Sequence, residues 1–269
     1  MNFDRKNAIL DTKLHTQEAQ LLEIFAKDEA IVIFDIGACE GESSVRYSRI
    51  FDKSQIYTFE PIPKNYRIIE SNIAEYEKSS QIHPFPVCLS NAIGEADFHI
   101  SSGTPEEFKE KNVDWEFGNK SSSLLPPDKT LQTYDWIEFK EKITVPTIRL
   151  DGFMKEHSIN QIDFVHLDVQ GAELMVLDGA GDLFGAIKNI WLEVEAVALY
   201  KGQPIKKDIE AYFKSRGYIK LIDTVNKVDG DQFWSKEDWI TDRKGQAWVT
   251  ERKAEIRRQE KEREVPFFQ

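Results

Sequence analysis

The sequence has few cysteines, no long apolar run and no excess of positive charge. Among its 269 residues there are 2 cysteines, Cys39 and Cys88, too few for the disulfide framework of a small secreted protein. No run approaches the roughly 18 apolar residues that a membrane-spanning helix needs. The first residues also lack the basic and then apolar layout of a signal peptide. We therefore expect a cytoplasmic protein with free thiols and no membrane span.

Acidic residues outnumber basic ones. The chain has 47 Asp and Glu against 35 Lys and Arg, a net charge of −12, which opposes binding to a polyanion. Nucleic acids and anionic membranes are therefore not expected partners. At 41% hydrophobic residues the chain has ample material for one large core. We expect an N-terminal helical segment (1–30), a central domain (31–235) and a charged C-terminal helix or tail (236–269).

The central domain alternates strand and helix patterns. Strands are predicted at 31–36, 55–61, 82–89, 162–168 and 190–195, and helices over 42–51, 65–76, 173–183 and 206–216, the last closed by Gly217. Such alternation favours a doubly wound, mostly parallel α/β sheet with helices on both faces. Pro84 and Pro86 place the start of the third strand at an edge. Further strands are predicted at 94–100, 143–150, 218–223 and 232–234.

The last two of these strands are expected to form an antiparallel edge hairpin, so that the sheet has an antiparallel last strand. Between 101 and 142 the sequence shows no sustained period, which predicts an insertion with a long loop or lid. In a sheet of strand order 3-2-1 the third strand lies two places from the first, roughly 9 to 10 Å away. Since a disulfide needs Cα atoms within about 7 Å, Cys39 and Cys88 are predicted not to be joined.

A glycine-containing loop follows the first strand. In Asp35-Ile36-Gly37-Ala38-Cys39-Glu40-Gly41, the glycines permit the tight turn and close approach of a cofactor loop. Cys39 stands where the second glycine of a dinucleotide loop belongs, and Glu40 would repel a phosphate. The loop therefore favours a nucleotide-like ligand that has no pyrophosphate.

An acid ends the second strand. Glu60 follows Gly41 by 19 residues, the position from which a carboxylate reaches the hydroxyls of a ribose. With the loop before it, Glu60 indicates an adenosine-containing ligand. S-adenosylmethionine fits best, because its ribose is not followed by a pyrophosphate.

At four places the chain resembles the FkbM-type S-adenosylmethionine-dependent methyltransferases, over about residues 31–223. The motifs are Phe34-Asp35-Ile36-Gly37-Ala38 with Gly41, Phe59-Glu60-Pro61, Arg149-Leu150-Asp151, and His166-Leu167-Asp168-Val169-Gln170-Gly171-Ala172-Glu173. The resemblance implies a class I methyltransferase, Rossmann-like fold and methyl transfer to a hydroxyl, often on a sugar or natural product. The chain departs from the family's usual residues at Cys39, usually Asn, and at His166, usually Lys.

Cofactor contacts are expected where these motifs meet the carboxyl ends of the strands. The predicted cofactor-binding residues are Asp35, Gly37, Ala38, Gly41, Glu60, Pro61, Ser90, Asn91 and Asp168. Ser90 and Asn91 are included because they stand where class I methyltransferases contact the adenine. The run Ser121-Ser122-Ser123 is similar to a serine-rich piece of the family's insertion, which approaches the active site.

The predicted catalytic residues are His166, Asp168 and Glu193. Methyl transfer requires an oriented acceptor and a group that takes its proton, and Asp168 ends the fourth core strand, where open α/β sheets bind ligands. His166 points to the same side of that strand and has an ordinary pKa near 6.5; its alternative role is that of a buried structural histidine. Glu193 shares a face with Glu195, and one of them is expected to face the acceptor.

Several alternatives remain open from sequence alone. Asp168, Glu193 and Glu195 are able to hold a divalent metal through oxygen ligands, although no metal is expected. Glu173 is expected to bind backbone amides at the start of its helix. The departures at Cys39 and His166 leave open a non-catalytic binding protein, and a nicotinamide-dependent oxidoreductase is disfavoured by Cys39 and Glu40. The acceptor would be selected by 101–142 and the N-terminal helices, where the sequence has no readable code.

Overall fold

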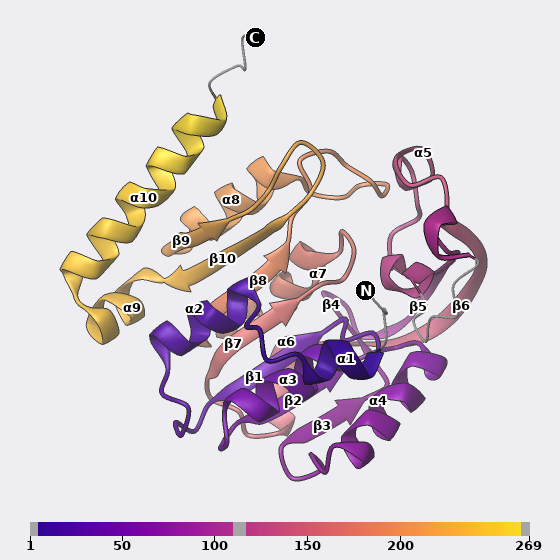
Figure 1. Cartoon of the computed structure of the whole chain (residues 1–269), viewed down its shortest axis with the longest axis horizontal. Coiled ribbons are helices and arrows are strands. Elements are labelled where there is room, and N and C mark those ends of the chain that lie inside the picture. The colour runs from indigo at the N-terminus through magenta and orange to yellow at the C-terminus, as the bar shows by residue number, and fades with distance from the viewer. Residues whose placement is uncertain (1–4, 110–116, 265–269) are drawn as a thin grey trace.

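A sheet of seven strands forms the centre of the computed structural model, which describes residues 5–109 and 117–264. Its order is β3-β2-β1-β7-β8-β10-β9 (Figure 1). The strands are β1 (Val32–Ile36), β2 (Gln55–Phe59), β3 (Ile82–Phe85), β7 (Ile162–Leu167), β8 (Ile187–Glu193), β9 (Tyr218–Asp223) and β10 (Asp231–Lys236). The pairs from β3 through to β8 are parallel, and β10 is antiparallel to both of its neighbours. The predicted doubly wound α/β fold with an antiparallel last strand is confirmed.

Helices cover both faces of this sheet. The helices of the described residues are α1 (Arg5–Leu10), α2 (Thr16–Ile24), α3 (Glu42–Ile50), α4 (Pro63–Glu75), α5 (Thr130–Thr133), α6 (Leu150–Glu156), α7 (Glu173–Asp178), α8 (Lys206–Lys214), α9 (Glu237–Lys244) and α10 (Gln246–Glu264). Of these, α5 belongs to the insertion and α10 lies along the β9 edge (Figure 1). Alternate strand residues enter opposite cores: Phe34 and Val165 pack with α6, α7 and α8, while Ile33 and Phe164 pack with α2, α3, α4 and α9. Burial on both faces explains why the central strands read as continuous apolar runs.

A smaller sheet stands beside the first. It has the order β4-β6-β5, with β4 (Cys88–Ser90), β5 (Gly94–Ser102) and β6 (Glu138–Arg149). The predicted single strand 82–89 is therefore wrong: its first half is β3, an edge strand as the prolines predicted, and its second half joins β6. Pro86 lies between them and has no N–H to continue a ladder, so the chain leaves the first sheet there.

Other boundaries differ where tertiary packing decides them. β9 and β10 form the predicted antiparallel hairpin, but β10 lies inside the sheet and β9 alone is at that edge. β6 begins at Glu138, within the predicted insertion 101–142. α7 ends at Asp178, before the predicted 183, and Gly179 follows it so close to β4 that an added Cβ atom would lie 2.3 Å from the Ser90 carbonyl oxygen. α8 ends at Lys214, and Gly217, with φ +76°, turns the chain into β9 instead of capping the helix.

Both terminal segments pack on the central domain. Arg46 of α3 donates to the carboxylate of Glu18 in α2 at 2.6 and 2.7 Å. α10 lies along the β9 edge (Figure 1) and buries Val249 and Ile256, so this charged segment is a docked helix through Glu264.

In the two described ranges, no helix is long and apolar enough to cross a bilayer.

Candidate active site

The loop after β1 has a left-handed backbone at three places. Gly37, Cys39 and Gly41 have φ of +81°, +52° and +80°, a conformation that favours glycine and costs other residues about 1 kcal/mol or more. The N–H groups of Gly37 and Ala38 both donate to the Phe59 carbonyl oxygen, at 3.0 and 3.1 Å. The loop is thus bound to the end of β2, and Gly41 caps the start of α3.

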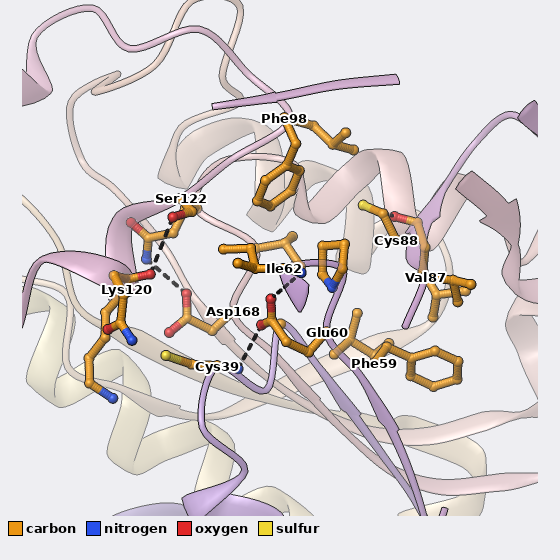
Figure 2. A pocket seen from close by; sticks show the side chains of 18 residues that line it. Cys39, Phe59, Glu60, Ile62, Val87, Cys88, Phe98, Lys120, Ser122 and Asp168 are labelled. Carbon is orange, nitrogen blue, oxygen red and sulfur yellow. Dashed lines mark hydrogen bonds between the residues drawn. The ribbon is translucent and has the colours of Figure 1, made fainter. Parts of the chain in front are cut away.

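A pocket of about 510 Å³, including the part open to solvent, lies at the carboxyl ends of β1, β2 and β7 (Figure 2). Of the predicted site residues, it is lined by Gly37, Glu60, Pro61 and Asp168. The predicted residues that do not line it are Asp35, Ala38, Gly41, Ser90, Asn91, His166 and Glu193. The structure therefore brings together the strand ends that were predicted to form the site, but only some of the predicted residues line the pocket.

Glu60 lies on the floor of this pocket. Its carboxylate accepts hydrogen bonds from the backbone N–H groups of Cys39, at 2.9 Å, and Ile62, at 2.8 Å (Figure 2). Burial raises the pKa of Glu60 to about 8, against the lowering effect of these two donors. The Asn65 side chain also hydrogen-bonds this carboxylate, and the two oxygens together keep one further lone pair with which to accept from a ligand hydroxyl.

Asp35 is buried below the loop, where it hydrogen-bonds α3. Its carboxylate accepts from the Ser44 hydroxyl at 2.6 Å, and Ser44 Oγ lies 2.7 Å from Thr58 Oγ1. Burial raises the pKa of Asp35 to about 7. The side chain therefore ties β1 to α3 and β2.

Ser90 and Asn91 lie beyond the pocket wall. The pocket reaches this part of the chain at Val87, Cys88 and Leu89, because the break at Pro86 moves β4 into the other sheet. The Asn91 carbonyl oxygen instead accepts from Arg149 at 2.9 Å. Arg149 also pairs with Asp151 at 2.8 Å, which gives the Arg149-Leu150-Asp151 motif a structural role.

Asp168 and Glu193 share one amide donor. The side-chain nitrogen of Gln170 donates to Asp168 Oδ1 at 2.8 Å and to Glu193 Oε2. Gln170 Oε1 accepts from the Tyr200 hydroxyl at 3.0 Å. Burial, followed by the charge of Asp168, raises the pKa of Glu193. Gln170 lines the pocket and Glu193 does not, so Glu193 is connected to the pocket by its hydrogen bond with Gln170.

His166 faces α3. Its Nδ1 lies 2.8 Å from the Tyr47 hydroxyl, and burial lowers its pKa to about 4. This hydrogen bond occupies Nδ1 whichever of the two atoms donates, and with this lowered pKa His166 is neutral near pH 7.

Two further acids are buried near Gln170. Glu173 accepts from the N–H groups of Val169 and Gly171, at 3.2 and 3.1 Å, as expected of an acid in a first helical turn. Burial raises the pKa of Glu195 to about 7. In the described part of the chain, the three acids within metal-ligand spacing are Glu210, Asp223 and Glu260, and the Lys220 ammonium pairs with all of them. The geometry therefore does not favour the metal alternative at Asp168, Glu193 and Glu195.

The insertion supplies part of the pocket wall that sequence reasoning missed. Phe98 of β5 and four residues of the following segment line it, namely Asn119, Lys120, Ser122 and Leu124. Lys120 pairs with Glu42 at 2.7 Å. Ser123 Oγ donates to the Gln170 carbonyl oxygen at 2.7 Å, which fastens the segment over the site. The serine run was the one sequence signal that pointed here.

Cys39 and Cys88 both line the pocket and are both free. Their predicted lack of a disulfide is confirmed. Cys88 lies in β4 of the smaller sheet, so its separation from Cys39 does not follow from the strand order on which the prediction rested.

The chain is similar to known methyltransferases in sequence. The model of the methyltransferase FkbM domain matches residues 35–220. The 2-O-methyltransferase NoeI of Sinorhizobium fredii is 31% identical over 191 residues, 71% of this chain and 72% of that protein. Methyltransferase sdnD of Sordaria araneosa is 25% identical over 209 residues, 69% of this chain and 73% of that protein.

Among solved structures, M. capricolum TrmK with S-adenosyl-homocysteine aligns with 83% of this chain and 69% of its own, at a TM-score of 0.41 and 12% identity. The METTL16 methyltransferase domain aligns with 83% of this chain and 70% of its own, at a TM-score of 0.43 and 11% identity. The FkbM match covers the β1 loop, the pocket and the strands up to β9. The chain belongs to the methyltransferase FkbM domain family and is an S-adenosylmethionine-dependent methyltransferase.

Proposed function

We propose that this enzyme methylates a hydroxyl of a sugar, a glycan or a similar small polar acceptor, which binds next to Asp168. The observation that carries the proposal is the paired arrangement of Asp168 and Glu193 on the Gln170 amide at the edge of the pocket. Methylation of oxygen is supported by the 2-O-methyltransferase NoeI, the 31% identical relative. Family membership favours methyl transfer over the oxidoreductase and non-catalytic alternatives.

The pocket has the groups that S-adenosylmethionine requires. In our proposal Glu60 accepts from a ribose hydroxyl, and the adenine lies against the apolar wall of Ile62, Leu89, Phe98 and Leu124. The backbone at Gly37 lets the cofactor approach closely. Glu40 is buried and accepts from the Asn119 amide at 3.1 Å, so the loop presents no cradle for a pyrophosphate.

When bound, the cofactor supplies an activated methyl group, and the protein orients the acceptor hydroxyl and takes up its proton. His166 is poorly suited to take it, because its Nδ1 is hydrogen-bonded with the Tyr47 hydroxyl and its side chain does not line the pocket. Asp168 is the proposed base and Glu193 its partner. Both carboxylates are acceptors in the Gln170 hydrogen bonds, and burial with the charge of Asp168 raises the pKa of Glu193, which makes its carboxylate a better proton acceptor.

The test is a methyl-transfer screen with isotope-labelled S-adenosylmethionine against nucleotide sugars and oligosaccharides, read by mass spectrometry. We expect label on a hydroxyl oxygen of at least one carbohydrate. Asp168→Asn should cut turnover at least a hundredfold while calorimetry shows retained S-adenosylhomocysteine binding. Asp182→Asn, an exposed acid, is the matched control. Label on nitrogen or carbon, or full turnover by Asp168→Asn, would contradict the proposal.

A further inference from the structure

Asn119 has a buried oxygen without a hydrogen-bond partner. The side chain lines the pocket and is 7% exposed. Its nitrogen donates to Glu40 Oε1 at 3.1 Å and to Asn65 Oδ1 at 3.4 Å. Within residues 5–109 and 117–264, no group donates to Asn119 Oδ1. Buried polar atoms are nearly always paired, so this atom calls for a donor from outside the chain.

The orientation of the Asn119 amide is fixed by its neighbours. Reversing it would place Oδ1 against the Glu40 carboxylate and against Asn65 Oδ1, both of which are acceptors. The nitrogen therefore faces Glu40, and the oxygen is the atom left for a ligand. The missing partner must be an O–H or N–H group.

Asn65 connects Asn119 to Glu60. Asn65, in the first turn of α4, hydrogen-bonds the Glu60 side chain as well as accepting from Asn119. The end of β2, the start of α4 and the insertion thus bring three polar side chains to one part of the pocket. Glu60 is the proposed acceptor for a ribose hydroxyl, and Asn119 is joined to it through Asn65.

We propose that Glu60 accepts a hydrogen bond from one ribose hydroxyl of S-adenosylmethionine and Asn119 Oδ1 from the other, so that the insertion completes the cofactor site. This inference rests on the proposed orientation of the cofactor. It also gives the serine run a role. Ser122 Oγ donates to the backbone carbonyl oxygen of Asn119 at 3.3 Å and accepts from the Ser101 N–H at 3.0 Å. These two bonds hold Asn119 against β5.

The test is a double-mutant cycle in which the ligand supplies the second change. Calorimetry measures wild-type and Asn119→Ala protein against S-adenosylhomocysteine and its 2′-deoxy and 3′-deoxy analogues. In wild type, loss of the contacted hydroxyl should weaken binding about tenfold. In Asn119→Ala, affinity for the intact ligand should fall about tenfold, and removal of that hydroxyl should cost at most about twofold more. The cycle cancels any general effect of the substitution on the fold.

Two controls separate the possible results. Asn160→Ala makes the same substitution at an exposed site and should leave every affinity unchanged. 5′-Methylthioadenosine keeps the ribose but lacks the amino-acid end, and Asn119→Ala should weaken its binding as much as that of S-adenosylhomocysteine. Weakening limited to S-adenosylhomocysteine would assign Asn119 to the ammonium group and overturn the ribose contact. Equal binding by Asn119→Ala and wild type would also overturn it, whereas failure of wild type to bind would count against the proposed cofactor site itself.

Discussion

Gly37 and Asp168 are in backbone contact at the centre of the site. A Cβ atom at position 37 would lie 1.8 Å from the Asp168 carbonyl oxygen, and the Asp168 N–H donates to the carbonyl oxygen of Ile36 at 3.0 Å. The loop proposed to receive the cofactor and the strand end that carries the proposed base therefore have a fixed separation. A side chain at position 37 cannot be accommodated without moving one of them.

We expect Gly37→Ala to abolish measurable S-adenosylhomocysteine binding and to lower the melting temperature. Two costs act together, the left-handed backbone at φ +81° and the clash with Asp168. Gly202→Ala separates them, since Gly202 has φ +76° and nothing within 4 Å of its added Cβ. That control should lose about 1 kcal/mol of stability and keep its ligand affinity. Equal affinity in the two variants would show that the contact between the loops is dispensable.

The parts of the fold that could be predicted from sequence are those set by local pattern. Ile31 to Ile36 and Ile162 to Leu167 are apolar runs that end in polar loops, and the acid after β2 and the glycine at 37 were found because their roles depend on strand ends. The mostly parallel arrangement of the core strands followed from the alternation of strands and helices.

The rest depends on contacts between distant segments. Pro86 marked a weak point in a strand, but only the pairing of Cys88 with Thr147 shows that the chain changes sheets there, which is why Ser90 and Asn91 miss the pocket. Asn119 and Lys120 lie in a segment without periodicity, and their position depends on bonds to Glu40 and Glu42. No local signal in the sequence identifies such partners.

The ligand-free protein should lose stability as the pH rises from 6.5 to 8. The folded-state pKa is raised to about 7 for Asp35, Glu195 and Asp231 and to about 8 for Glu60. The folded protein then binds more protons than the unfolded chain across this window, so stability present at low pH is lost as these groups ionise. His166, with its pKa lowered to about 4, acts in the opposite direction only below about pH 6.5.

Urea unfolding at pH 6.5 and 8 measures this effect. Glu60→Gln, which mimics the protonated acid, should reduce the difference in unfolding free energy between the two pH values. Asp182→Asn, at an exposed site, should leave it unchanged. A stability that rises over this interval would contradict the assigned directions.

Arg46→Met should cost about 3 to 5 kcal/mol of stability, because it leaves the Glu18 carboxylate buried without its partner. Arg46 and Glu18 are 5% and 1% exposed, and Arg46 also donates to the carbonyl oxygens of Asp11 and Lys13. Lys142→Met breaks the exposed pair with Asp97, which solvent screens, and should cost far less stability than Arg46→Met. Urea unfolding measures the loss of stability in both variants. Similar losses would show that burial does not decide the strength of the Arg46–Glu18 pair.

Both thiols should react slowly in the native protein. Burial raises the pKa of Cys39 and raises that of Cys88 to about 12, so at pH 8 the reactive thiolate of Cys88 is scarcer than in an ordinary thiol by roughly a thousandfold. Iodoacetamide labelling followed by peptide mass spectrometry should show fast reaction of both only in denaturant. Since both line the pocket, S-adenosylhomocysteine should slow the native reaction further. Fast labelling that the ligand does not change would argue against the buried position.

Gln170→Glu should destabilise the protein in a pH-dependent way. The wild-type amide donates to Asp168 and Glu193 and accepts from Tyr200. A glutamate there loses both donors and adds a third negative charge between two carboxylates, which we expect to cost about 3 kcal/mol at pH 8.

Gln170→Met is the matched control for this charge, since it removes the donors at similar size. At pH 5.5 the new carboxyl is expected to be largely protonated, because its acidic neighbours and its burial raise its pKa. It then donates one hydrogen bond, and Gln170→Glu should approach the stability of Gln170→Met. At pH 8 the glutamate variant should have the lower unfolding free energy of the two in urea. The backbone carbonyl oxygen of Gln170 also accepts from the Ser123 hydroxyl, which ties the insertion to this loop. Amide hydrogen exchange over residues 117–125 should therefore be faster in the glutamate variant at pH 8. Equal losses in both variants at both pH values would mean that Asp168 and Glu193 do not repel a charge placed between them, and the pairing proposed for the acceptor site would fail with that result.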